Sequence, residues 1–180
     1  NGLVLAGENG VIGGLIIDGF SGSGIVVSGG NNLIGNTTPA EANILVNNAV
    51  DGLRITGAAA VNVNVFGNFI GTDDANSNEP NLQYGVRIVG GAGGTTTPNI
   101  IGGMGAGEAN VIRNNQAGGV LVNGVDTSGN QIIGNEIAST PASVAIGVLI
   151  SGAADTNTVD QNLISFGLIG VQIEAANTNT

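Results

Sequence analysis

A six-residue pattern that returns along the whole chain is the strongest constraint on its fold. Each copy begins at a glycine and has aliphatic residues at its second and fourth positions. The copies are GLVLAG (from Gly2), GIVVSG (Gly24), GLRITG (Gly52), GVRIVG (Gly85), GVLVNG (Gly119), GVLISG (Gly147) and GVQIEA (Gly170). Alternation over so few residues, bounded by glycine, predicts a β-strand. The copies are separated by roughly 20 to 35 residues, the length of one solenoid coil.

Two shorter strand signals lie between successive copies. They have the form Asn-x-Ile-x-Gly-Asn-x-Ile, as in NQIIGNEI from Asn130 and NTVDQNLI from Asn157. Residues 32–72 also align without a gap on residues 99–139, which lie two coils further along the chain. We therefore predict an all-β fold, a parallel β-helix of about seven coils with three short strands per coil. It should occupy residues 1–180 as a single segment.

The composition agrees with such a stack. Aliphatic residues of successive coils can rest on one another in columns, whereas bulky aromatic residues do not fit there, and only 3% of the residues are aromatic. The alternation predicts outward-pointing side chains for Arg54 and Arg87, and buried ones for Leu53, Ile55, Val86, Ile88, Val120, Val122, Val148 and Ile150. Corner residues that turn left-handed and hydrogen-bond along the stack are expected at Asn48, Asn68, Asn115, Asn135 and Asn162.

Three of these motifs together resemble a known family. GNFIGTD from Gly67, NIIGGMGAGEANVI from Asn99 and the GVxIxG strands are similar to the right-handed parallel β-helix repeat proteins of bacteria. Many of those are secreted or surface proteins, related in architecture to pectate lyases. The resemblance implies a right-handed solenoid at an extracellular or cell-surface location. It does not indicate an activity, since one fold of this kind carries many functions.

Charge and residue inventory exclude several function classes. The net charge is −10, with three arginines and no lysine, so the chain cannot neutralise a nucleic-acid backbone. Apolar runs are short and interrupted by glycine, which argues against insertion into a membrane. Histidine and cysteine are absent, and seven scattered aspartates form no column: Asp18, Asp51, Asp73, Asp74, Asp126, Asp155 and Asp160. Because glycoside hydrolysis needs two carboxylates at one cleft, we expect no catalytic residues.

The most polar stretch, residues 72–81, has two interpretations. Asp74, Asn76, Asn78 and Glu79 provide oxygen ligands at a spacing that could surround Ca²⁺, although the glycine typical of a tight calcium loop is missing. The simpler interpretation is a turn between two strands, built from Asp, Asn, Ser and Pro. We expect no bound cofactor, with Ca²⁺ as the alternative. Asn36 also begins an Asn-Thr-Thr glycosylation sequon, a short motif that is common by chance.

The third position of the repeated strand is predicted to face outward, yet it is mostly apolar. Up the stack it has Val4, Val26, Arg54, Arg87, Leu121, Leu149 and Gln172. A solvent face should be polar, so something is expected to cover this column. Either loops of the same chain cover it, or the column packs laterally on another chain or domain through Val26, Arg54, Arg87, Leu121 and Leu149. The two neighbouring arginines repel one another unless an anion lies between them.

These features favour a non-enzymatic structural or adhesive segment of an extracellular surface protein or fibre. Neither end of the sequence provides a helix or charged cap over its strands. We therefore expect the stack to be continued end to end, either by more coils of the same polypeptide or by another copy docked head to tail. Surface glycans are a second class of partner. The alternative function is a carbohydrate-binding or polysaccharide-degrading β-helix whose active residues lie in its loops or outside this segment.

Overall fold

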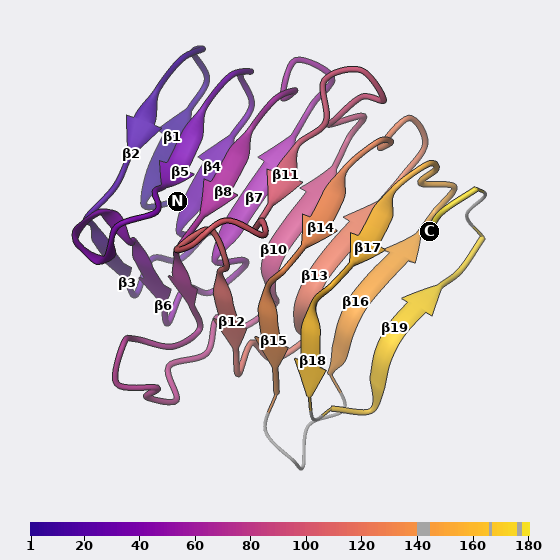
Figure 1. Cartoon of the computed structure of the whole chain (residues 1–180). Helices are drawn as coiled ribbons and strands as arrows, with labels where there is room; N and C mark the ends of the chain where they lie inside the picture. Colours follow the sequence, from indigo (N-terminus) through magenta and orange to yellow (C-terminus); the bar gives the residue numbers. More distant parts are fainter. Residues whose placement is uncertain (140–144, 166, 176–177) are drawn as a thin grey trace.

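The fold is a parallel β-solenoid, as predicted. The computed structural model describes residues 1–139, 145–165, 167–175 and 178–180. In Figure 1 the coils advance along one axis from the indigo N-terminal end to the yellow C-terminal end. Each of the first six coils contributes in turn to three sheets, and the seventh contributes a strand to one of them. Each interior strand pairs in parallel with its equivalents in the coils before and after it.

The seven copies of the hexapeptide pattern form one sheet, which we call sheet A. Its strands, in order, are β1 (Leu3–Leu5), β4 (Ile25–Val27), β7 (Leu53–Thr56), β10 (Tyr84–Val89), β13 (Gly118–Asn123), β16 (Ile146–Ser151) and β19 (Ile169–Ile173). The pairing aligns the third positions of all seven copies in one column, from Val4 to Gln172.

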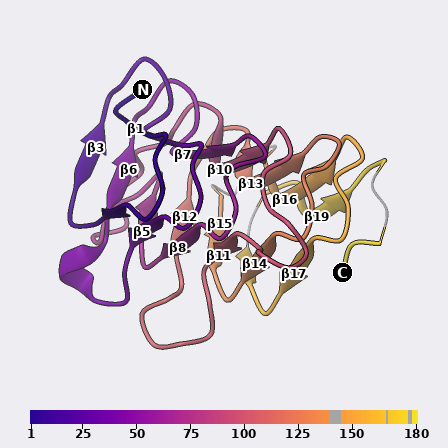
Figure 2. The ribbon, with the colours of Figure 1, turned by 90° about the horizontal axis from the view of Figure 1, so that it is seen from above.

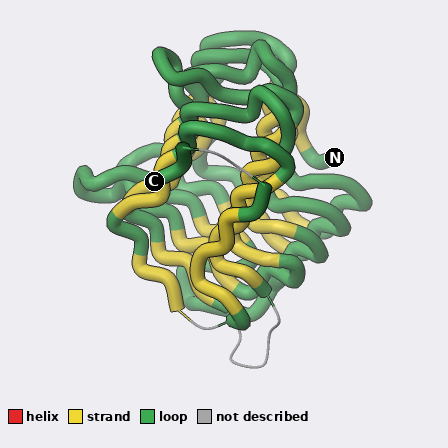
Figure 3. The backbone as a smooth tube through the Cα atoms, turned by 90° about the vertical axis from the view of Figure 1, so that its right-hand side faces the viewer, coloured by secondary structure: helices red, strands yellow, loops and turns green. Residues whose placement is uncertain are grey.

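The shorter strand signals form two further sheets of six strands each. Sheet B contains β2 (Val11–Ile12), β5 (Leu33–Gly35), β8 (Asn64–Phe66), β11 (Ile100–Ile101), β14 (Gln131–Ile133) and β17 (Thr158–Asp160). Sheet C contains β3 (Ile16–Asp18), β6 (Ile44–Val46), β9 (Phe69–Ile70), β12 (Val111–Arg113), β15 (Glu136–Ala138) and β18 (Leu163–Ser165). Figures 2 and 3 show these coils from above and from the side that carries the C-terminus.

The core consists of aliphatic columns between the sheets. All eight side chains predicted to be buried in sheet A, from Leu53 to Ile150, have no exposed surface. Arg54 and Arg87 point away from this core and remain half-buried. The register predicted from the alternation is therefore correct, since a shift by one residue would have placed both arginines inside.

Asparagine ladders run along the corners of the stack. In each ladder the backbone N–H and the Nδ2 of one asparagine both donate to the Oδ1 of the asparagine in the next coil, as from Asn43 to Asn68 at 3.2 and 2.9 Å. One ladder contains Asn43, Asn68, Asn110, Asn135 and Asn162, and a second contains Asn48, Asn81 and Asn115. The five asparagines named from the sequence are thus confirmed as corner residues, while Asn43, Asn81 and Asn110 had not been identified.

The conformation predicted for these five asparagines was wrong. The left-handed residue is the one that precedes each of them: Asn47, Gly67, Asn114, Gly134 and Gln161 all have positive φ. The corner therefore uses two residues with separate roles. In Gly67-Asn68 the glycine turns the chain with a φ of 66°, and the asparagine then makes the hydrogen bonds to the adjacent coils.

Little other secondary structure interrupts the coils. A single turn of 3-10 helix, η1 (Pro39–Glu41), lies between β5 and β6. Among the residues that the structure describes, no helix has the length and apolar character needed to cross a membrane.

Candidate functional site

The outward column of sheet A is the surface that the sequence predicts to be covered by other loops or by another chain. Leu121 is buried in this column, with 5% of its surface exposed, and Val4 at the first coil is 56% exposed. Val26, Arg54, Arg87, Leu149 and Gln172 are half-buried. The predicted interface residues are therefore brought together in one line, and most of them keep some accessible surface.

A buried carboxylate lies beside the two arginines of this column. Arg54 and Arg87 are direct neighbours in the register of β7 and β10. Asp51, which has no exposed surface, places its Oδ2 3.7 Å from Nη1 of Arg87. This is the anion that the repulsion between the two guanidinium groups required.

The position of Asp51 follows from the repeat. It directly precedes the hexapeptide GLRITG, and its backbone position pairs with that of Tyr84, which precedes GVRIVG. Its Oδ1 accepts a hydrogen bond from the Tyr84 N–H at 3.3 Å. The residues before the hexapeptide glycines thus form a second column along sheet A, a regularity of the sequence that could have identified both residues.

Tyr84 completes this cluster, which we call the arginine cluster (Asp51, Arg54, Tyr84 and Arg87). The Cζ atom of Arg87 lies 5.5 Å from the centroid of the Tyr84 ring, within the range of a cation–π contact. The edge of the same ring lies against Gly118 of the next coil, where an added Cβ would come 3.1 Å from it. Arg87 is therefore held between a carboxylate and an aromatic face.

Burial dominates the electrostatics of Asp51. Desolvation raises the pKa of its carboxyl group above the ordinary value of 3.8, and the charge of Arg87 opposes this shift most strongly. The Asp51 Oδ2 and the Nε atoms of Arg54 and Arg87 are buried and have no hydrogen-bond partner among the described residues.

The three arginines differ in their partners. Arg113, on sheet C, forms an ion pair with Glu136 of the next coil. Arg87 pairs with Asp51 at 3.7 Å. For Arg54, no carboxylate oxygen lies within 4 Å in the described part of the chain.

The polar loop between β9 and β10 is organised by Asp73, which was not among the four proposed calcium ligands. Its carboxylate accepts hydrogen bonds from the Ser77 N–H at 2.8 Å and the Ser77 hydroxyl at 2.9 Å. These two hydrogen bonds lower the pKa of Asp73 below its ordinary value.

The four proposed ligands do not form a preformed site. Asp74, Asn76 and Asn78 are exposed and Glu79 is half-buried, and no hydrogen bond joins any two of them in this fully described loop. Across all described residues, no group of three or more Asp or Glu side chains is placed to hold a metal ion. Calcium binding by this loop remains a hypothesis from the sequence.

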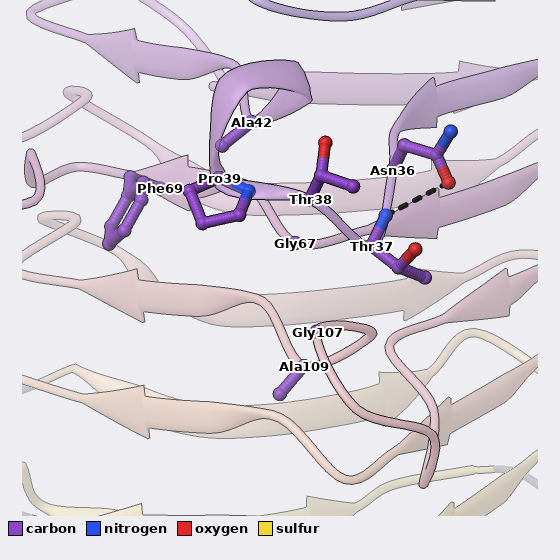
Figure 4. A pocket seen from close by; sticks show the side chains of 9 residues that line it. All are labelled: Asn36, Thr37, Thr38, Pro39, Ala42, Gly67, Phe69, Gly107 and Ala109. Atoms are coloured by element: carbon purple, nitrogen blue, oxygen red, sulfur yellow. Dashed lines mark hydrogen bonds between the residues drawn. The ribbon is translucent and has the colours of Figure 1, made fainter.

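A shallow pocket of about 180 Å³ lies on another part of the surface, beside η1 (Figure 4). Phe69 and Pro39 lie at one end, and Asn36 and Thr37 lie at the other. The Asn36 Oδ1 accepts a hydrogen bond from the Thr37 N–H at 2.9 Å, within the sequon noted above. Thr38, Ala42, Gly67, Gly107 and Ala109 complete the lining.

No family model, no curated protein and no solved structure matches this chain. The coils, their open ends and the arginine cluster therefore provide the basis for a functional proposal.

Proposed function

We propose that this chain is a non-enzymatic structural or adhesive segment of an extracellular β-solenoid, and that further coils continue it along its axis. The supporting observation is the apolar character of its two ends. On the last coil, Val171 and Ile173 occupy core columns, yet they are 43% and 48% exposed. Their equivalents one coil earlier, Val148 and Ile150, are completely buried.

The first coil has the same character. Leu3, Leu5 and Ile12 begin core columns of sheets A and B and are half-buried. Their equivalents one coil later, Ile25, Val27 and Ile34, have no exposed surface. Strands β1, β2 and β3 each lie at the end of a sheet, so their outer edges have no strand on them among the described residues. Natural sheets usually cover such edges, because an uncovered strand pairs readily with another.

Lateral packing on the arginine cluster is the second part of the proposal. The column of Val26, Arg54, Arg87, Leu121 and Leu149 combines apolar surface with Arg54, which has no carboxylate oxygen within 4 Å among the described residues. A neighbouring chain with an acidic side chain opposite Arg54 would complement this surface.

The test of axial stacking is the molar mass measured by light scattering over a range of concentrations. We expect the mass to rise above the 17.6 kDa of one chain as the concentration increases. Val171→Lys, which places a charge on the open end, should suppress this rise. Val125→Lys is the matched control, because Val125 is 68% exposed but lies in the loop after β13. A monomer at every concentration, or equal behaviour of both variants, would contradict stacking between copies.

The proposal also predicts no turnover of acidic polysaccharides. We expect no lyase or hydrolase activity on pectin or alginate, with or without added Ca²⁺. Reproducible activity that is lost in Asp73→Asn or Asp74→Asn would contradict a purely structural role.

The pocket at Phe69 favours carbohydrate binding as the second candidate function. An aromatic ring beside threonine hydroxyls offers both a face for stacking and donors for hydrogen bonds. Titration of oligosaccharides, followed by NMR with Phe69→Ala as the control, tests this candidate. Binding that the variant abolishes would support it.

A further inference from the structure

We propose that the free edge of β18 is a docking site for one more parallel β-strand, which carries an asparagine at its start and an isoleucine or leucine two residues later. This inference rests on the proposed axial continuation of the solenoid. It specifies where the next strand binds and what sequence that strand has.

The C-terminal end of the stack has a step at β18. In sheet A, β19 covers β16. In sheet B, the chain end covers β17, since the Val159 N–H donates to the Thr180 carbonyl and the Thr180 N–H donates to the Asn157 carbonyl. In sheet C no described segment pairs with the outer edge of β18. At the level of the seventh coil, the position next to β18 in sheet C is therefore the one without a described strand.

The side chains of β18 show the effect of this open edge. Ile164 continues the core column of sheet C and pairs with Ile137 of the preceding coil. Ile137 is almost completely buried, whereas Ile164 keeps accessible surface. One more inward aliphatic residue would cover it, as Ile137 is covered by Ile164 itself.

The asparagine ladder indicates what the next strand must offer. Asn135 donates from its backbone N–H and from Nδ2 to the Oδ1 of Asn162, both at 2.9 Å. Asn162 donates from Nδ2 to the carbonyls of Ile132 and Asp160, but it has no following Oδ1, and its backbone N–H has no partner in the described chain. The backbone N–H of Asn162 is therefore the donor without a partner at this edge of the described chain, whereas its Nδ2 already donates to two carbonyls. In the preceding coil the next Oδ1 accepts from both groups, and an acceptor at the corner of the incoming strand would do the same.

The same corner in the other coils identifies that acceptor. From the second coil to the sixth, an asparagine directly precedes each sheet C strand: Asn43, Asn68, Asn110, Asn135 and Asn162. The residue two positions later is Leu45, Ile70, Ile112, Ile137 or Ile164. A strand with the same pattern would extend both the ladder and the core column in register.

The first strand of sheet C in a second copy of the chain does not meet these requirements. Its corner residue is Leu15, whose backbone N–H uses the Oδ1 of Asn43 and whose side chain offers no acceptor. A copy stacked with its β1 on β19 would place its β3 two coils beyond β18, because sheet A already has one strand more than sheet C. Copies can therefore stack on β19, but such a stack leaves the edge of β18 uncovered. The partner is therefore an asparagine-bearing strand of a further coil.

The test uses the full chain with a strand tethered after Thr180. One extension carries the sequence of residues 109–115, ANVIRNN, on a flexible Gly-Ser linker, and a matched extension has leucine in place of its first asparagine. We expect hydrogen exchange of the amides in β18 to be slowed at least about tenfold by the asparagine extension relative to the leucine extension. Exchange in β3, at the opposite end, should be unchanged.

A change at Asn162 provides the second arm. In Asn162→Ala, checked for native circular dichroism, the difference between the two extensions should become smaller, because Nδ2 is lost and only the backbone N–H remains at the corner. Equal exchange with both extensions, or a difference that is undiminished in Asn162→Ala, would overturn the inference. Light scattering separates this failure from that of the proposed stacking. A chain that remains monomeric would contradict stacking between copies, but it would not change the hydrogen exchange measured with the tethered strand.

Discussion

The carboxylate of Asp51 lies 3.7 Å from the guanidinium of Arg87, and these two residues belong to adjacent coils. Asp51 is completely buried, whereas the Arg87 side chain is 28% exposed. This pair allows Arg54 and Arg87 to occupy neighbouring positions of one column, where two unbalanced cations would repel one another.

Removing Arg87 should therefore be costly. In Arg87→Ala the buried Asp51 carboxylate loses its nearest cation, and we expect the free energy of unfolding to fall by about 2 to 4 kcal/mol. Arg113→Ala is the matched control, because its ion pair with Glu136 is about one-third exposed, and it should cost about 1 kcal/mol or less. Chemical denaturation at neutral pH measures both. Equal losses would contradict a special role for Asp51.

The raised pKa of Asp51 predicts a pH dependence with a defined sign. Below pH 3.8 this carboxyl group is protonated in both the folded and the unfolded chain. As the pH rises from 3.8 through the raised pKa of the folded state, the unfolded chain releases its proton first, so the contribution of Asp51 to stability decreases.

Asp51→Asn isolates this contribution. The asparagine keeps an oxygen for the Tyr84 N–H but does not titrate. The stability of the wild type relative to Asp51→Asn should therefore fall as the pH rises from 3.8 through the raised pKa of the folded state. Denaturation curves at several pH values provide the measurement, and a difference that grows with pH would contradict the direction of the pKa shift.

The asparagine ladder predicts a large effect of a small substitution. Asn68 is buried, accepts from Asn43, and donates to Asn110 and to the carbonyls of Ile34 and Phe66. In Asn68→Ala these buried groups lose their partners, and we expect a loss of about 3 kcal/mol or more in the free energy of unfolding. Asn78→Ala, at an exposed position, should change it by about 0.5 kcal/mol or less. Similar effects of both substitutions would show that the ladder is not stabilising.

The sequence was sufficient to predict the strands and their register, because the hexapeptide repeats the same spacing in every coil. Leu53 and Ile55 alternate with Arg54, and only one register places both aliphatic residues inside. The corner asparagines could be predicted as positions but not as conformations. Both Asn47 and Asn48 suit a tight corner, and only the coordinates show that Asn47 turns left-handed while Asn48 forms the ladder.

The arginine cluster could be predicted only in part. The sequence placed Arg54 and Arg87 on adjacent coils and required an anion beside them. It did not identify that anion, because Asp51 lies outside the hexapeptide and reaches Arg87 diagonally on the adjacent coil. The cation–π contact with Tyr84 was missed for the same reason.

The loop at residues 72–81 provides the final prediction, which concerns calcium. Since Asp73 already accepts two hydrogen bonds from Ser77 and the four proposed ligands are not gathered, we expect millimolar Ca²⁺ to leave the melting temperature unchanged within about 1 °C. Asp73→Asn should lower the melting temperature equally with and without Ca²⁺, since it weakens the hydrogen bonds within the loop. A calcium-dependent rise of several degrees that is lost in Asp74→Asn would instead establish a calcium site there.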